Sequence, residues 1–98
     1  MLCPIYNLFL ATYILHKAGA ECDSSDTMLG KMSSVQKCAD ACRQNSGCRF
    51  FVYGHSSKSG KCYREDTKTA DCSEGWKNND YDFYEITGII LYTILYNI

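Results

Sequence analysis

Two uncharged apolar segments lie near the ends of the chain, and a more polar stretch separates them. One run covers residues 8–15 and is interrupted only by Thr12, and the other, TGIILYTILYNI, covers residues 87–98. Both are shorter than the roughly 20 apolar residues that a membrane-spanning helix needs. The pattern predicts a central domain, residues 21–86, with a segment outside it at each end.

Residues 1–20 have the pattern of a secretory signal peptide. After the apolar run, the sequence AGA at residues 18–20 places small residues at the two positions that signal peptidase inspects. No Lys or Arg precedes the run, which departs from the usual pattern. The alternative is an uncleaved anchor, for which the run is short. We expect cleavage between Ala20 and Glu21 and a secreted, extracellular domain.

The tail over residues 87–98 is rich in β-branched and aromatic side chains and carries no charge. Such a segment is prone to aggregate when it is exposed. It is compatible with an added edge strand, with a self-association contact, or with a reading frame that ends at an arbitrary point. Any membrane association or oligomer formation is expected through this tail.

The segment SSVQKCADACRQNSG, residues 33–47, predicts an amphipathic helix. Ser33 and Gln36 have the spacing of a capping box, in which each side chain bonds the backbone of the other. Apolar side chains recur with the i, i+3, i+4, i+7 spacing of one helix face, at Val35, Cys38, Ala39 and Cys42. Gly47 suits the left-handed position at which such a helix ends.

Four short segments predict strands. Residues 48–53 and 61–64 are rich in aromatic and β-branched residues and flank a polar loop, as in a β-hairpin. Residues 81–86 predict a further strand, and residues 27–32 a weaker one. The order of strand, helix and strands favours an α+β fold with one helix packed on an antiparallel sheet.

Seven cysteines in 98 residues point to a disulfide framework. Cleavage after Ala20 removes Cys3 and leaves six, for which about 15 pairings exist. Zinc is the competing use, but zinc sites contain paired short Cys or Cys–His clusters, and His55 is the only histidine in this region. We therefore expect three disulfides and no metal.

Charge and motifs argue against several classes of function. Ten basic and 11 acidic residues provide no basic field for nucleic acid. No phosphate-binding loop or EF-hand is present, and Asp23 with Asp26 offers too few ligands for calcium. Glu65 and Asp66 are expected in a solvated turn. Without a catalytic set around His55, we expect no enzyme activity and no cofactor.

The runs KCADACRQNSGCRFFVYGHSSKSGKCY and DCSEGWKNNDYDFYEI resemble the PAN/Apple domain family. The matching features are the C-x3-C helix, the GCRFFVYG strand, the cysteine strand after a Ser/Gly/Lys loop and the closing aromatic strand. The resemblance covers about residues 21–86 and implies a small disulfide-rich fold. It implies the pairs Cys22–Cys72, Cys38–Cys62 and Cys42–Cys48. It also implies a binding module, for proteins in some members and sugars in others.

Two groups of side chains are candidates for ligand contact. The first follows the hairpin loop: Tyr53, His55, Lys58, Lys61 and Tyr63. The second is Trp76 with Asn78. Aromatic faces can stack on sugars or anchor proteins, and the polar groups can bond the ligand. The competing interpretation is that the aromatic residues belong to the core and the polar ones are solvated.

We expect a secreted adhesion-type module that recognises an extracellular protein or glycan. The alternative is a small accessory subunit of a larger extracytoplasmic or membrane-associated assembly, docked through the apolar tail.

Overall fold

The computed structural model describes residues 2–97, with side chains over residues 8–93, so Met1 of the predicted leader and Ile98 of the tail lie outside it. The elements in chain order are β1 (Leu2–Lys17), β2 (Ala20–Cys22), β3 (Asp26–Lys31), α1 (Val35–Gln44), β4 (Phe50–Gly54), a 3-10 turn (Ser56–Lys58), β5 (Lys61–Glu65), β6 (Trp76–Asn78) and β7 (Tyr81–Asn97). No helix among these residues is both long and apolar enough to cross a membrane.

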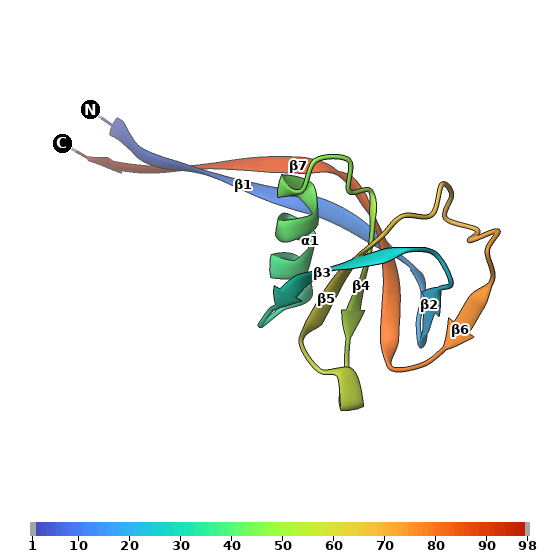
Figure 1. Ribbon diagram of the computed structural model, residues 1–98. Coiled ribbons are helices and arrows are strands. Elements are labelled where there is room, and N and C mark those ends of the chain that lie inside the picture. Colours follow the sequence, from blue (N-terminus) through green and yellow to red (C-terminus); the bar gives the residue numbers. More distant parts are fainter. Residues whose placement is uncertain (1, 98) are drawn as a thin grey trace.

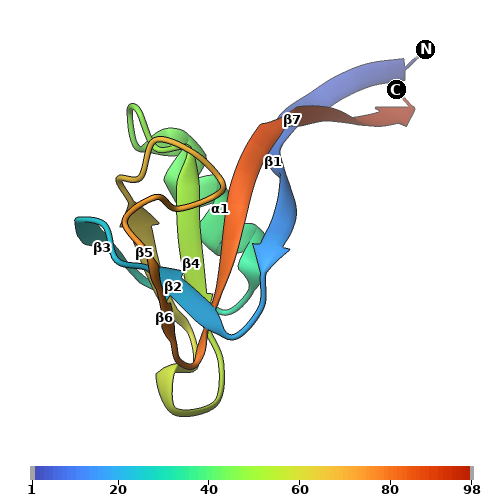
Figure 2. The same ribbon diagram turned by 90° about the vertical axis from the view of Figure 1, so that its right-hand side faces the viewer.

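The strands form a five-stranded sheet in the order β1-β7-β4-β5-β3 and a two-stranded sheet of β2 and β6, with antiparallel pairing throughout. Side chains alternate between the two faces of β4. Phe51 packs on one face with the buried stripe of α1, and Phe50 and Val52 pack on the other face with Cys22 and Trp76. The large sheet therefore lies between α1 and the small sheet (Figure 2). The prediction of one helix on an antiparallel sheet is confirmed.

The helix begins one residue later than the capping-box prediction implies. Ser34, not Ser33, is the N-cap, and its hydroxyl accepts from the Lys37 amide at 3.1 Å. Gln36 does not reach back to the cap, because its side chain donates to the carbonyl oxygen of Ala11 at 2.8 Å. The Gln36 side chain, which a capping box would use, is thus bonded to β1 instead. The end agrees with the prediction, since Gly47 has a φ of 82°.

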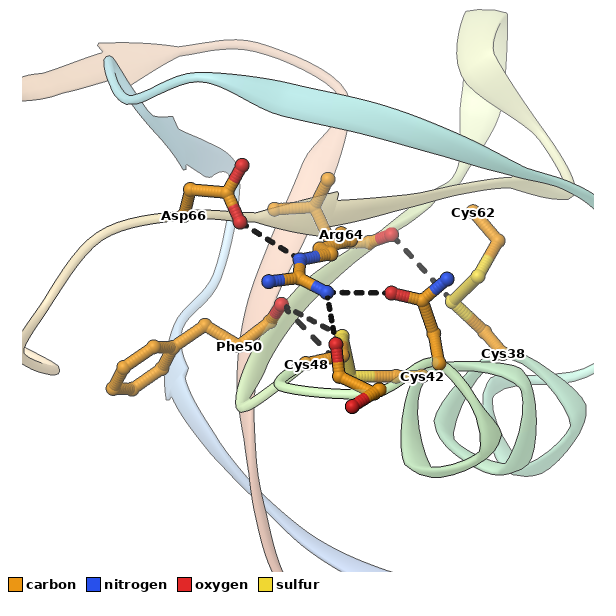
Figure 3. Close-up of a disulfide and its surroundings, with 10 residues drawn as sticks. Cys38, Cys42, Cys48, Phe50, Cys62, Arg64 and Asp66 are labelled. Carbon is orange, nitrogen blue, oxygen red and sulfur yellow. Dashed lines mark hydrogen bonds and ion pairs between the residues drawn. A yellow bond between two sulfur atoms is a disulfide. The ribbon is translucent and has the colours of Figure 1, made fainter.

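Three disulfides hold the layers together: Cys22–Cys72, Cys38–Cys62 and Cys42–Cys48. These are the pairs that the resemblance implies. Cys38 and Cys42 leave the same helix for different partners (Figure 3). Each bond contributes about 2–4 kcal/mol in the chain-entropy account, which is a large part of the net stability of a small domain.

β1 and β7 are the longest strands, and together they extend beyond the rest of the domain (Figure 1). Their pairing runs from Lys17 with Phe83 to Leu2 with Asn97. The strand predicted over residues 81–86 therefore continues through most of the tail. Of the roles considered for the tail, the structure shows strand pairing, with β1 as its partner.

The predicted leader forms β1 and the first residue of β2. Ala11 and Ala20 are buried, and the Tyr13 ring meets Phe51 and Tyr84 edge-on. Cleavage after Ala20 stays a prediction. In the uncleaved chain these residues are an integral part of the sheet, because β1 pairs with β7 along most of its length.

Candidate functional site

The tyrosines that flank the hairpin loop lie on opposite faces of the sheet. Tyr53 is opposite Cys62 and packs on the helix side, where its hydroxyl donates to the carbonyl oxygen of Met32 at 2.8 Å. Tyr63 is opposite Val52 on the other face, and its ring meets Tyr81 edge-on at 5.9 Å. The two rings therefore cannot form one stacking platform. The sequence did not reveal this, because the register of the hairpin decides which face of the sheet each side chain lies on.

Trp76 is half-buried on the face away from the helix. Its ring meets Phe83 edge-on at a centroid distance of 5.0 Å, and the Lys17 ammonium lies 5.5 Å from the ring centroid. Asn78 is exposed on the same strand, opposite Ala20 of β2. Trp76 thus serves mainly as core, and Asn78 remains open to a ligand.

The hairpin loop meets the turn between β6 and β7 at one end of the molecule. The His55 amide donates to the carbonyl oxygen of Asp80 at 2.9 Å, and the Ser57 hydroxyl and amide both donate to the Asp80 carboxylate. His55 Nε2 lies 3.3 Å from Asp82, which also accepts from the Gly19 amide. We call His55, Ser57, Lys58, Asp80 and Asp82 the loop surface.

The electrostatics of the loop surface are set by Asp80. The hydrogen bonds from Ser57 hold the pKa of the Asp80 carboxyl below its usual range, and the charges of His55 and Lys58 lower it further. Asp80 is therefore a fixed negative charge that already has oriented donors.

The two lysines of the first candidate group are separated. The Lys58 backbone lies against Gly54, where a Cβ would come within 2.0 Å of the Lys58 carbonyl oxygen. This close approach fixes the loop and places Lys58 beside Asp80. Lys61 instead lies in β5 opposite Lys31 of β3, outside the loop surface.

His55 has the contacts of a proton-transfer group but lacks a cleft. Ser56 Oγ lies 3.2 Å from its Nδ1, and Asp82 lies on the Nε2 side. His55 and Ser56 are exposed. Neither residue lines the 270 Å³ cavity beside α1 or the 450 Å³ cavity beside Arg64.

An acidic group lies on the face of the sheet away from α1. Glu65 of β5 is 2% exposed, so its expected place in a solvated turn is wrong. One oxygen accepts from the Ser24 hydroxyl at 2.7 Å, and Oε1 is buried with no hydrogen-bond partner among the described residues. Burial, helped by the nearby charges of Asp26 and Glu21 and opposed by the Ser24 hydrogen bond, raises the pKa of Glu65 to about 8. The alternation along β5, which carries Tyr63 and Glu65 to one face, is the signal that could have found it.

A groove runs between α1 and the extended strands. It has a volume of 270 Å³ and is lined by Phe9, Ala11, Asp40, Arg43, Gln44 and Ile89. The extended strands also carry exposed apolar side chains, which alternate between the two faces of the ribbon: Leu8, Phe9, Ile14, Leu15, Ile89, Ile90, Leu91 and Tyr92. A concentration of exposed apolar side chains of this kind marks an interaction site or an aggregation hazard. We call these eight residues the ribbon surface.

Comparison with known families supports the resemblance found in the sequence. The model of the PAN domain matches residues 12–88, which include the helix, the three disulfides and parts of β1 and β7. The comparisons with curated proteins and with solved structures gave no significant match. The match covers more than half of the chain, so the protein belongs to the PAN domain family.

Proposed function

We propose that this chain is a non-enzymatic binding module that acts outside the cell and recognises a protein through its loop surface. PAN domains are known as protein- and carbohydrate-binding modules and are generally non-catalytic. A PAN domain with three disulfides is typical of extracellular proteins. The observation that carries the proposal is the loop surface itself, in which two segments distant in sequence present oriented polar groups on a cross-linked scaffold.

The placement of the aromatic residues favours a protein over a glycan. Sugar recognition commonly uses an exposed aromatic face, and the rings of Tyr53, Tyr63 and Trp76 pack against the two cores. The loop surface offers charges of both signs instead, with His55 and Lys58 beside two aspartates. Such a surface suits a polar protein partner, whose charges it can match.

The proposal is tested by affinity capture from extracellular fluid, with a glycan array run in parallel. The captured protein is then titrated against Asp80→Asn and His55→Ala variants of the full chain. We expect each variant to weaken binding about tenfold, which corresponds to about 1.4 kcal/mol. Asp71→Asn is the matched control, because it removes an exposed carboxylate outside the loop surface. Binding that both loop variants leave unchanged, or binding of glycans alone, contradicts the proposal.

The ribbon surface favours a second function, that of an accessory subunit docked on another protein. β4 covers β7 only from Tyr81 to Glu85, so the extended part pairs with β1 alone. Open backbone edges are costly in hydrocarbon, which argues against insertion into lipid. A protein partner that adds a strand to this ribbon would satisfy the edge and cover the apolar side chains.

Size-exclusion chromatography with light scattering tests this second function on the full chain. If the ribbon surface docks a protein, the double variant Phe9→Ser with Leu91→Ser should no longer form the complex with that protein. Binding through the loop surface should stay as in the wild type. Met28→Ser is the control, because Met28 is a similarly exposed apolar residue outside the ribbon. Equal complex formation by the ribbon variant and the control contradicts docking through the ribbon.

A further inference from the structure

Three carboxylates converge on the face of the large sheet away from the helix, from three different strands. One oxygen each of Glu21 in β2, Asp26 in β3 and Glu65 in β5 lies within 4.8 Å of the others. Two oxygens bound to one calcium ion at about 2.4 Å can be at most about 4.8 Å apart. The three carboxylates meet this limit without any movement.

Glu65 provides a second, independent sign of a missing partner. Its side chain is almost completely buried, and Oε1 has no hydrogen-bond partner among the described residues. A buried polar atom without a partner destabilises the folded state, and more so when the group is charged. The other oxygen, Oε2, accepts a hydrogen bond from the Ser24 hydroxyl. The atom without a partner therefore belongs to Glu65, which is the most buried of the three acidic residues.

Among the described residues, no basic side chain offsets the acidic charges that act on Glu65. The charges that act on Glu65 come from Asp26, Glu21 and Asp66, and all are negative. Neighbouring cations are engaged elsewhere: Arg64 donates to Asn45, Ser46 and Asp66, and Lys77 pairs with Asp23 at 3.6 Å. Figure 3 shows the Arg64 side chain directed toward the end of the helix. Asp26 and Glu65 are also directly opposite in the β3–β5 pairing, so ionisation of both would place like charges side by side in the sheet.

We propose that Glu21, Asp26 and Glu65, together with the Ser24 hydroxyl, form a calcium-binding site that ties β2 to the edge of the large sheet. Calcium accepts six to eight oxygen ligands in flexible geometry, so water completes the shell on the side of the exposed Asp26. Magnesium is a poorer fit, because it demands near-ideal octahedral geometry and keeps several of its waters, whereas Glu65 is almost completely buried. The site does not depend on the proposed recognition function.

The test uses the full oxidised chain after removal of metal with a chelator. Terbium, a calcium substitute, is titrated with excitation of tyrosine, since the charges of all three carboxylates act on the buried Tyr81. Calcium is then added as competitor, and its affinity is measured by calorimetry. We expect saturable binding with a dissociation constant of about 10⁻⁴–10⁻³ M, as in extracellular calcium modules, and a higher melting temperature with calcium than with equal magnesium.

Two variants separate a binding site from a merely buried acid. Asp26→Asn alters an exposed residue and should weaken calcium binding at least about tenfold in a folded protein. Glu65→Gln should remove the calcium-dependent rise in melting temperature and raise the melting temperature of the metal-free protein. Asp71→Asn is the charge-matched control and should bind as the wild type does. Absence of saturable calcium binding up to 10 mM (about ten times the weakest expected constant), terbium that calcium does not displace, or equal binding by Asp26→Asn and Asp71→Asn overturns the proposal.

Discussion

At the scale of single residues, burial distinguishes acidic side chains that look alike in the sequence. Glu65 and Asp66 are adjacent, but Glu65 is buried on the inner face of β5, whereas Asp66 is exposed and pairs with Arg64 at 2.7 Å. Glu85 differs from both, because it lies between two basic side chains. His16 Nε2 and Arg49 Nε each lie 2.7 Å from its carboxylate.

The carboxylate of Glu85 should make folding sensitive to acid. The hydrogen bond from His16 lowers its pKa below the usual value of 4.5, and Arg49 lowers it further. A group with a depressed folded pKa stabilises the protein above its unfolded pKa, and this contribution is lost as the pH falls through the folded pKa. Glu85→Gln should therefore be less stable than wild type at pH 7, by up to about 1 kcal/mol, and the difference should shrink below pH 4.5.

Urea unfolding of wild type and Glu85→Gln measures this difference in the free energy of unfolding. The measurements run from about pH 3 to about pH 7, so that they cover the titration of the carboxylate. Asp71→Asn controls for the change in net charge, since Asp71 is exposed and distant in sequence from both partners. A stability difference that is the same at both ends of the pH range would show that the ion pairs contribute nothing.

At the scale of elements, the helix is held by covalent bonds and by the strand beside it. Its apolar stripe could be read directly from the 3.6-residue period, and Cys38, Ala39 and Cys42 are indeed buried. The cap could not be predicted from the sequence, because the Gln36 side chain bonds the backbone of β1, a strand that the sequence did not predict. Local spacing thus determines the buried face, and the neighbouring element determines what the polar side chains do.

Removal of the Cys38–Cys62 bond should destabilise the domain more than removal of Cys42–Cys48. The first closes a segment of 24 residues and the second one of six. In the chain-entropy account, the longer loop is worth about 1 kcal/mol more. We expect the alanine double variant at Cys38 and Cys62 to be poorly folded or to melt lower than the double variant at Cys42 and Cys48.

Calorimetric melting of the two double variants measures this order, with peptide mapping under non-reducing conditions to verify the remaining bonds. A Cys38/Cys62 variant that keeps the wild-type melting temperature would contradict the view that these bonds carry much of the stability.

At the scale of the whole molecule, the first strand connects the helix layer to the end of the chain. The Ala11 amide donates to the Asp40 carboxylate at 2.8 Å, and Tyr13 covers Phe51 and Tyr84 on β4 and β7. A chain cleaved after Ala20 would lose these contacts and expose the β7 edge. Its PAN domain would also lack residues 12–20 of the family match.

A chain that begins at Glu21 should therefore be less stable than the full chain. Tyr13 is partly buried, so loss of its contacts alone removes burial worth about 1 kcal/mol. For a domain of this size, that corresponds to a melting temperature roughly 4–8 °C lower. Thermal unfolding of both chains measures the effect, and the mass of the exported protein shows which of them exists outside the cell. Equal melting temperatures would mean that β1 contributes no net stability.

Most of the central domain could be predicted from the amino-acid sequence. Short-range periodicity specified the amphipathic helix, and compact aromatic runs specified the hairpin and the closing strand. The order of the cysteines and aromatic residues together carried the resemblance to the PAN family. The helix and strands depend on neighbours within a few residues, and the cysteine order is a property of the sequence itself, so both can be read without coordinates.

The tertiary structure alone decided where the chemistry lies. The register of the large sheet sent Tyr53 and Tyr63 to opposite faces, and the packing of loops and of the small sheet brought Asp80 to Ser57 and Glu21 to Asp26 and Glu65. It also joined the apolar ends as β1 and β7, which separately resembled a leader and a tail. The physical reason is that pairing between strands links residues far apart in the chain, and a shift of one position moves every side chain to the other face.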